Sequence, residues 1–428
     1  MNGNKRIRNL KRLKYFLEKE GWISESQAQE MTDCDQYRDV MIQIKRLAEK
    51  GDAGALFMLG VDQALRCRDF DKAFAFYKES ADKGYAPALC EAAQYYEIGT
   101  VVEKNLRKAV LLYLEAAMKG YAEAQYCLAV CYDEGQGVRK NEAEAVRWYR
   151  AAAEQEHEKA QFCLGNCYYW GDGVEVDKKT ALIWFERAAE NEHVQAQLDA
   201  GICYEDGIGT KPDLQRAIRW YTAAAEQDDP TAQYYLGLFY ELGKGVELSA
   251  STAYSYYMKA AKYDGNANAQ YRLGYFYENG VGVEKDLGRA FDYYEKAADN
   301  KVSRAMCQLG RFYEEGLCFE PRLSNAVYWY ERAADEGEPE AQYRMGLFCE
   351  KGEGVKKSLK TATQWYLKAA EQDHADAQYK AGEAYRKGFF RPDFGVKKDD
   401  RIAREWYEKA ARQGHEGASD RLRRYHES

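Results

Sequence analysis

A stretch of 36 residues recurs in register over most of this 428-residue chain. The clearest copy runs from Ala267 to Val302 and reads ANAQYRLGYFYENGVGVEKDLGRAFDYYEKAADNKV. Self-similarity at a fixed period of roughly 20–50 residues is the signature of architectures whose units pack mainly on their neighbours. The period therefore restricts the chain to folds built by stacking one small unit many times.

Each copy predicts a first helix, a glycine turn and the start of a second helix. With the copy numbered 1 to 36, positions 3, 7 and 11 hold Ala269, Leu273 and Tyr277, which share one helical face. The Gly-Val-Gly-Val run from Gly280 interrupts that helix, because glycine tolerates the dihedral angles of a tight turn. Position 20 then holds side chains that cap a new helix: Asn105, Asn141, Asp177, Asp213, Ser249, Asp286, Ser358 and Asp399.

The second helix carries small and aromatic residues, among them Ala290, Tyr294 and Ala297. Large rings between small residues suit closely packed helices, and Gly274 at position 8 lets a neighbour approach the first helix. The unit is therefore a helical hairpin. Because one hairpin cannot bury its own apolar face, the units are expected to stack.

Ten copies follow one another. A degenerate copy, Ala53 to Tyr85, lacks the Gly-x-Gly turn, the Pro230 copy has one extra residue, and the last copy has five. The nine regular copies begin at Ala86, Ala122, Glu158, Val194, Pro230, Ala267, Ser303, Pro339 and Ala375.

The repeat resembles the Sel-one-like repeat, a relative of the tetratricopeptide repeat. The matching residues are the A-x-A-Q-Y-x-L-G-x-x-Y-E-x-G-x-G-V core of Ala267–Val283 and the A-x-x-W-Y-x-x-A-A segments Ala217–Ala225, Ala326–Ala334 and Ala362–Ala370. The resemblance implies an all-α solenoid, a right-handed superhelix of about ten stacked helix-turn-helix repeats. It also implies a non-enzymatic scaffold or adaptor that binds other proteins. Two turns depart from the pattern, at Gly316-Leu317-Cys318 and at Val101.

Three segments are expected: residues 1–52 as a basic N-terminal helix and helical cap, 53–415 as the array, and 416–428 as a polar C-terminal cap. Seven basic side chains lie in the first 20 residues, beside a rough apolar stripe. They indicate either a solvated capping helix or a basic amphipathic helix that contacts a membrane surface, an acidic partner or RNA. The stripe consists of Ile7, Leu10, Leu13 and Leu17. The expected cap, Tyr37 to Asp52, resembles an isolated second helix with Val40, Ile44 and Leu47 on one side.

Composition narrows the class further. The N-terminus has no apolar signal segment and no stretch is long enough to cross a membrane, so we expect a cytoplasmic protein, with signal-less secretion left open. A net charge of −8 argues against general nucleic-acid binding. The eleven cysteines should then be reduced thiols.

Two groups of potential metal ligands have structural interpretations that we favour. Four cysteines at positions 6 and 10 of adjacent copies could bind zinc, but position 10 elsewhere holds phenylalanine, so buried thiols are expected. Four histidines at position 36 lie in the turn between repeats, with no further converging ligands. These residues are Cys127, Cys131, Cys163, Cys167, His157, His193, His374 and His415.

No catalytic residue, metal or cofactor is predicted. The complete G-x-G-x-x-G and P-loop motifs are absent. Ser80 and Lys83 match only the first half of a β-lactamase motif, within a predicted helix. Because some relatives carry that label, a β-lactamase-like or other hydrolase activity is the alternative function, beside an adaptor acting on membranes or nucleic acid through residues 1–20.

Comparison of the copies predicts where a partner binds. Positions 2, 6, 9 and 13 vary and share one face of the first helix, which in tetratricopeptide-like solenoids lines the concave groove. We expect a protein or peptide segment with an apolar centre and an acidic end, although exposed positions can also drift freely. The predicted groove residues are Trp170, Ile202, Tyr235, Leu238, Leu242, Arg272, Tyr275, Arg311, Arg344 and Lys351. An insertion, Gly388 to Asp400, carries Phe389, Phe390 and Phe394, which either pack on the cap or contact a partner.

Overall fold

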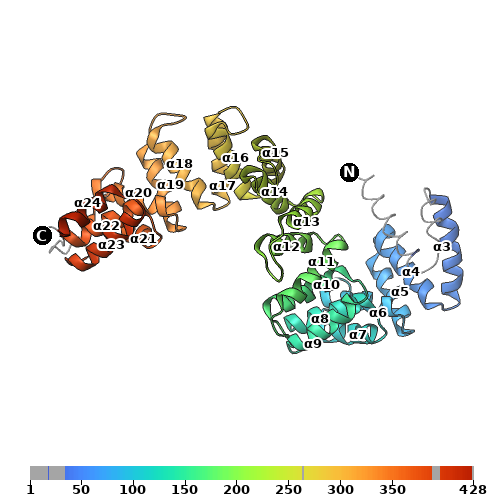
Figure 1. Cartoon of the computed structure of the whole chain (residues 1–428). Coiled ribbons are helices and arrows are strands. Elements are labelled where there is room, and N and C mark those ends of the chain that lie inside the picture. The colour runs from blue at the N-terminus through green and yellow to red at the C-terminus, as the bar shows by residue number, and fades with distance from the viewer. Residues whose placement is uncertain (1–17, 19–33, 263–264, 388–395, 427–428) are drawn as a thin grey trace. The chain divides into compact units, whose positions relative to one another are not determined.

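A computed structural model describes residue 18 and residues 34–262, 265–387 and 396–426. In these ranges every regular element is a helix and no strand occurs, as predicted for an all-α solenoid. Successive helices pack side by side in antiparallel pairs (Figure 1). We call the first helix of each repeat its A helix and the second its B helix.

The chain forms two compact units, residues 1–220 and 221–428, each with its own packed helices. The boundary lies inside α13 (Leu214–Glu226). The other helices described in the first unit are α3 (Cys34–Glu49), α4 (Ala53–Asp62), the π-helical η1 (Gln63–Cys67), α5 (Phe70–Asp82), α6 (Ala86–Ile98), α7 (Leu106–Met118), α8 (Ala122–Glu134), α9 (Glu142–Ala153), α10 (Glu158–Trp170), α11 (Lys178–Glu190) and α12 (Val194–Asp206).

The second unit continues the same alternation of A and B helices. Its helices are α14 (Pro230–Leu242), α15 (Ala250–Ala260), α16 (Ala267–Asn279), α17 (Leu287–Asp299), α18 (Ser303–Glu315), α19 (Leu323–Asp335), α20 (Pro339–Lys351), α21 (Leu359–Glu371), α22 (Ala375–Lys387), α23 (Asp400–Arg412) and α24 (Glu416–His426).

The turn between the helices of one hairpin forms as its sequence predicts. Helix α16 ends at Gly280, whose φ of 69° lies in the left-handed region that glycine adopts without a Cβ clash. Helix α17 begins where the side chain of Asp286 accepts the backbone N–H of Arg289 at 3.0 Å. All eight position-20 residues proposed as N-caps accept such a bond, so that prediction is confirmed.

Helix packing inside a repeat depends on the glycine at position 8. A Cβ atom on Gly274 would lie 2.6 Å from the ring of Tyr294, a residue of the B helix in the same repeat. Gly310 stands in the same relation to Tyr330, at 2.7 Å. The predicted close approach is therefore an approach of a fully buried tyrosine ring to the A-helix backbone.

Both turns with an atypical sequence form the hairpin nonetheless. Helix α6 ends at Gly99, with φ of 80°, and helix α18 ends at Gly316, with φ of 68°. Where other repeats have a second glycine packed against the preceding B helix, the thiol of Cys318 donates to the carbonyl oxygen of Leu287 at 3.2 Å. In this repeat a side chain therefore makes the contact with the preceding B helix that the glycine backbone makes in other repeats.

Neighbouring repeats are joined by a glutamine at position 4. The side-chain amide of Gln342 donates to the carbonyl oxygen of Ala334, at the end of the preceding B helix, over 3.1 Å. Its own oxygen accepts from Gln372, in the following interhelical turn, over 3.0 Å. The carbonyl oxygen of Ala334 also accepts the backbone N–H of Gly337 at 3.1 Å, so the glutamine adds a second hydrogen bond at this helix end. The same donation to the preceding B helix is made by Gln125, Gln161, Gln197, Gln233 and Gln378.

The two ends of the array are covered by single helices. In α3, Met41, Ile44 and Ala48 are buried, whereas Leu47 is 36% exposed. The buried face is therefore rotated by about one residue from the predicted stripe of Val40, Ile44 and Leu47. At the other end, α24 packs on α23 through Ala418 and Leu422. Apart from Glu18, the predicted basic helix of residues 1–20 lies outside the described residues, as does the Phe389–Phe394 loop.

Candidate partner-binding surface

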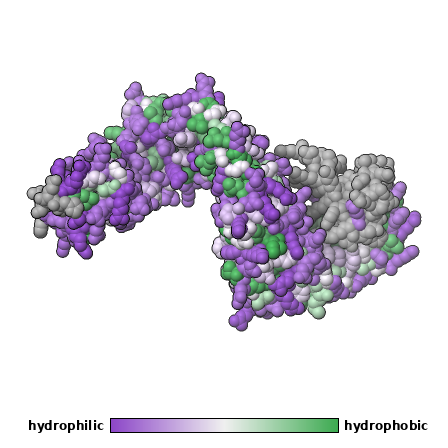
Figure 2. All heavy atoms as spheres, viewed as in Figure 1, coloured by the Kyte–Doolittle hydropathy of each residue, from purple (hydrophilic) through white to green (hydrophobic). Residues whose placement is uncertain are grey.

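We call the surface formed by positions 2, 6, 9 and 13 of the A helices the A-face. In the nine regular repeats, positions 6, 9 and 13 are half-buried or exposed, except for Glu383, which is buried. All ten predicted groove residues therefore reach the surface of their unit. Trp170 is 68% exposed, Leu242 64% and Tyr275 39%, which are large values for aromatic and aliphatic side chains. Figure 2 shows that hydrophilic residues cover most of the visible face of each unit, interrupted by hydrophobic patches.

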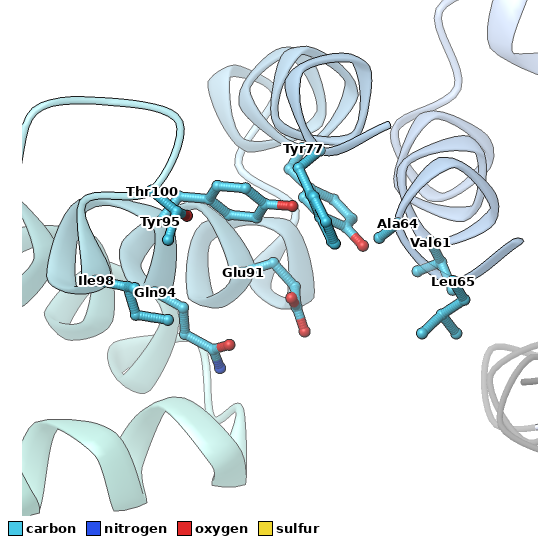
Figure 3. Close-up of a pocket in the computed structure, with 10 residues that line it drawn as sticks. Val61, Ala64, Leu65, Tyr77, Glu91, Gln94, Tyr95, Ile98 and Thr100 are labelled. Atoms are coloured by element: carbon cyan, nitrogen blue, oxygen red, sulfur yellow. The ribbon is translucent and has the colours of Figure 1, made fainter. Parts of the chain in front are cut away.

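A cavity of about 250 Å³ opens on the A-face where the degenerate first repeat meets α6. Glu91, Gln94 and Ile98, at positions 6, 9 and 13, form one side (Figure 3). Val61, Ala64 and Leu65 form the other, and the ring of Tyr77 lies between. Burial, together with the charge of Glu91, raises the pKa of Tyr95 in this cavity to about 12, so its hydroxyl stays protonated.

A second cavity, of about 180 Å³, lies between α10, α11 and α12 in the same unit. It brings together Trp170 and Ile202, two of the predicted groove residues. Asp199 contributes a carboxylate whose pKa is raised by burial and lowered in part by a hydrogen bond from Gln195. The remaining lining residues are Asn166, Tyr169, Phe185 and Cys203.

A third cavity, of about 350 Å³, lies in the second unit between α21, α22 and α24. Lys380, Glu383 and Lys387, at positions 6, 9 and 13 of the last repeat, line it with Arg421 of the terminal helix. Burial alone would raise the pKa of Glu383, but hydrogen bonds from Arg386, Tyr407 and Lys387 lower it to about 2. This cavity is therefore lined by charges that already pair with one another.

The aromatic and aliphatic groove residues of the second unit lie along α14 and α16. Tyr235 stacks on Tyr221 with ring centroids 5.1 Å apart and planes within 8° of parallel. Leu238 packs against the cluster around Tyr257 and Phe276, and Leu242 at the helix end is exposed. These side chains form a surface strip, whereas Trp170 and Ile202 share a cavity.

The basic groove residues are paired inside the protein. The guanidinium of Arg272 lies 3.4 Å from Oε1 of Glu241, and Arg311 forms an ion pair with Glu278. Arg344 lies 2.7 Å from Glu340 and 3.7 Å from Glu314, and Lys351 lies 3.5 Å from Glu353. The C-terminal half therefore does not present the free positive charge that a partner with an acidic end would require.

The acids at position 12 were missed by comparison of positions 2, 6, 9 and 13. In most repeats a position-12 carboxylate accepts a hydrogen bond from the hydroxyl of a buried tyrosine. This tyrosine lies sixteen residues later, at position 28 on the B helix. In the second unit the carboxylate also faces a cation from the next A helix. The tyrosine–acid pairs are Tyr113–Glu97, Tyr149–Asp133, Tyr257–Glu241, Tyr294–Glu278, Tyr330–Glu314 and Tyr366–Glu350.

The position-36 histidines cap helices. Nδ1 of His193 accepts the backbone N–H of Ala196 at 3.2 Å, and the imidazole stacks on Phe162. In three other repeats Nδ1 makes the same bond while Nε2 faces a carboxylate at position 2. A ring nitrogen that accepts is unprotonated, so Nε2 carries the proton and donates to that carboxylate. These histidines are His157, His374 and His415.

The cysteines have no geometry suited to a metal. No cluster of three potential ligands among His, Cys, Asp and Glu occurs within the described ranges. Cys131 and Cys167 are buried, and burial raises the pKa of each thiol to about 12. Both free thiols are therefore protonated near neutral pH.

Ser80 cannot act as a surface nucleophile in this structure. It is fully buried, and its hydroxyl donates to the carbonyl oxygen of Ala53 at 2.6 Å. The partial β-lactamase motif therefore marks a contact between the two helices of the first repeat.

Comparison with known proteins identifies the family of the repeats. The Sel1 repeat profile matches ten consecutive segments, 53–85, 86–121, 122–157, 158–193, 194–229, 230–262, 267–302, 303–338, 339–374 and 375–415. The chain belongs to the Sel1 repeat family. The degenerate first copy is thus one of its repeats, and the predicted count of ten is confirmed.

Two solved Sel1-type structures are similar over most of their length. A protective antigen present in uropathogenic Escherichia coli strains, displaying an SLR fold, is 30% identical, with a TM-score of 0.63 over 90% of each chain. A Sel1 repeat protein from Oxalobacter formigenes is 32% identical, with a TM-score of 0.60 over 74% of this chain and 90% of that chain. Comparison with curated proteins gave no match.

Sel1 repeats generally mediate protein interactions, and their solenoid is typically a non-catalytic scaffold. No helix within the described parts of the chain combines the length and apolar character needed to cross a membrane. The Sel1 repeat at 158–193 has Tyr169 at position 12, where seven other repeats have an acid, and Phe185 at position 28, where those seven have tyrosine. That paired exchange was visible in the sequence and points to the second cavity.

Proposed function

We propose that this protein is a non-enzymatic scaffold or adaptor that binds a protein or peptide segment on its A-face. A fourth cavity, lined by Trp365 and Lys368 among others, lies on the B helix α21. The supporting observation is the position of the three cavities described above. In each, residues at positions 6, 9 or 13 of A helices form a wall, although these positions are not the ones the fold needs for its core. Concave sites with aromatic walls and a few polar groups are typical binding sites.

The exposed apolar side chains of the A-face support the same conclusion. Trp170 and Leu242 gain little from folding because about two thirds of each residue remains in water. Tyrosine and tryptophan are the usual anchors of protein interfaces.

The basic residues contribute less to this proposal than the sequence indicated. Arg272, Arg311 and Arg344 are held by internal carboxylates, so an acidic ligand would have to displace those partners. We therefore assign recognition in the second unit mainly to Tyr235, Leu238, Leu242 and Tyr275. The cytoplasmic location and the role of residues 1–20 stay predictions from the sequence.

The test compares two variants of the intact chain with the unaltered protein as baits in the native lysate. The A-face variant carries Tyr235→Glu, Leu238→Glu and Tyr275→Glu. The control carries Leu111→Glu, Met118→Glu and Ile183→Glu, which alter exposed apolar residues of B helices. Circular dichroism checks that both fold, and captured proteins are identified and bound again as purified components.

The proposal expects a partner that binds the unaltered chain and the B-helix variant and is lost from the A-face variant. Loss from the B-helix variant alone would move the site to the opposite helices. Equal binding by all three proteins would remove the A-face of the second unit from the interface. Substrate turnover by the unaltered chain would favour the hydrolase alternative.

A further inference from the structure

The repeat at 158–193 departs from the others in three linked positions. Tyr169 stands where seven of the other repeats have a position-12 acid, and Phe185 stands where those seven repeats have a tyrosine at position 28. The two rings pack together with centroids 6.1 Å apart. At position 6 of the next A helix, where Arg272 and Arg344 provide cations, this repeat boundary has Asp199. The local charge pattern is thus reversed.

Within the described residues Asp199 has no cationic partner. Its carboxylate accepts a hydrogen bond from the side-chain amide of Gln195, at 2.9 Å. No lysine, arginine or histidine in the described ranges lies within ion-pair distance of it. A carboxylate half-removed from water gains most from an added positive charge, because burial disfavours the charged form until a partner compensates.

The walls of the same cavity suit a cation. Trp170 is exposed at its mouth, with its ring edge-on to Tyr169 at 4.8 Å, and Asn166 offers a side-chain amide. Tryptophan is the strongest aromatic partner for a guanidinium or ammonium group. A cavity of about 180 Å³ is smaller than a typical drug-sized site but similar to an engineered cavity of roughly 150 Å³ that holds benzene. It therefore has room for one side chain.

One internal cation already lies beside these rings. Nζ of Lys178 is 3.2 Å from the ring centroid of Tyr169 and 5.3 Å from that of Trp170. It donates to the carbonyl oxygen of Tyr169 at 2.5 Å, so its charge is held at the N-terminus of α11. This arrangement shows that the ring pair attracts an ammonium group, while Asp199 is left without one.

We propose that this cavity is a specific binding site for a basic side chain, arginine or lysine, of the partner segment that the A-face binds. The proposal rests on the proposed function and adds its chemistry: in the first unit the partner is recognised by positive charge. Asp199 pairs with the incoming cation, Trp170 stacks on it, and Ile202 contacts its aliphatic stem. The partner thus supplies the cation that Arg272 and Arg344 supply internally in the second unit.

The test uses the full chain labelled with 5-fluorotryptophan and synthetic peptides as probes. The chain has eight tryptophans, and Trp170→Phe assigns the resonance of interest. One peptide is acetyl-Gly-Gly-Arg-Gly-Gly-amide. Two others replace its arginine by lysine or by citrulline, which keeps the shape and removes the charge. We expect saturable shifts of the Trp170 resonance by the arginine or lysine peptide, at about millimolar concentration for a single side chain.

Two variants decide whether Asp199 is responsible. Asp199→Asn should weaken binding of the charged peptides by about tenfold. Asp206→Asn, on the same helix but exposed, should leave it unchanged within about twofold. The citrulline peptide should not shift Trp170. Equal shifts by citrulline, equal binding by Asp199→Asn, or no shift by any peptide would each overturn the inference.

These outcomes are independent of the A-face variant of the lysate experiment, which alters only the second unit. If capture depends on Tyr235, Leu238 and Tyr275 but no basic peptide shifts Trp170, the scaffold function stands and this site does not. If the peptides bind but no partner is lost from the A-face variant, the site stands and the wider groove fails.

Discussion

The hydroxyl of Tyr330 donates a hydrogen bond to Oε2 of Glu314 at 2.8 Å, from a ring that is only 1% exposed. Glu314 lies sixteen residues earlier, on the A helix of the same repeat, and also faces Arg344 of the next repeat. One carboxylate therefore ties a B helix to its own A helix and to the following A helix. Burial and the neighbouring Glu314 raise the pKa of Tyr330 well above its usual range, so the phenol stays a donor.

Replacing this phenol measures the strength of the link. Tyr330→Phe removes a hydrogen bond to a charged acceptor, and we expect a loss of about 1–3 kcal/mol in the free energy of unfolding. Urea denaturation of the full chain checks the value. Phe185→Tyr is the matched control: because Tyr169 replaces the acid there, the added hydroxyl has no carboxylate to meet and should not stabilise. If that control had a higher free energy of unfolding, the hydroxyl would stabilise the fold without a bond to the acid.

The glutamine at position 4 can be tested in both directions. Gln342→Met should cost about 1–3 kcal/mol, because the amide bonds to Ala334 and Gln372 are lost within a buried site. The repeat at 303–338 naturally has Met306 at this position. Met306→Gln should instead stabilise by roughly 0.5–1.5 kcal/mol if the new amide reaches the preceding helix end. The same urea assay gives both values, and opposite signs are the expected result.

His193 makes stability depend on pH. Burial lowers the pKa of its imidazole below the usual value of 6.5, so the folded chain favours the neutral ring whose Nδ1 accepts the N–H of Ala196. This contribution is complete above the unfolded pKa, about 6.5. It is lost as pH falls through the lower folded pKa, because protonation turns the acceptor into a donor.

The corresponding variant is His193→Asn, since Asn266 caps α16 at the equivalent position without titrating. Between pH 7.5 and 5 the Tm of the unaltered chain should fall further than that of the variant, as followed by circular dichroism. An identical pH dependence of the two proteins would assign the effect to other groups.

The reversed charge pattern around Asp199 can be converted to the common one. Tyr169→Glu, Phe185→Tyr and Asp199→Arg together rebuild the arrangement of Glu241, Tyr257 and Arg272. We expect a folded protein with a Tm within a few degrees of the original, and no response of Trp170 to arginine peptides. Tyr169→Glu alone should be less stable, because it adds a half-buried acid without a donor. A triple variant that still bound the peptides would contradict the role given to Asp199.

The sequence predicted the hairpin well, for local reasons. Ala269, Leu273 and Tyr277 define one helical face, and Gly280 and Asp286 end and begin helices through contacts within a few residues. Such features depend only on nearby sequence. Because the pattern occurs in ten copies, it can be recognised even where a single copy deviates. The buried face of α3 was misplaced by a residue, because a single helix without copies leaves Leu47 and Ala48 equally plausible as core.

The candidate site was less predictable because its groups meet across repeats. Arg272 looked like a free cation until its distance to Glu241, 31 residues away, was known. Periodicity shows which positions share a helix face, but it does not show which side chain of the neighbouring repeat lies opposite. The exchange at Tyr169 and Phe185, in contrast, could have been read from the copies, since both positions change in the same repeat.

The position-4 glutamine also makes the array extensible. It belongs to one repeat and bonds to a carbonyl group of the repeat before it, so a complete unit brings a donor for its predecessor and an acceptor for its successor. Duplication or loss of a whole unit with this glutamine thus keeps the bond at the junction, whereas a break inside such a unit would remove it. Gene duplication can lengthen such a chain one unit at a time, because each added unit packs through the interface that the existing units already use.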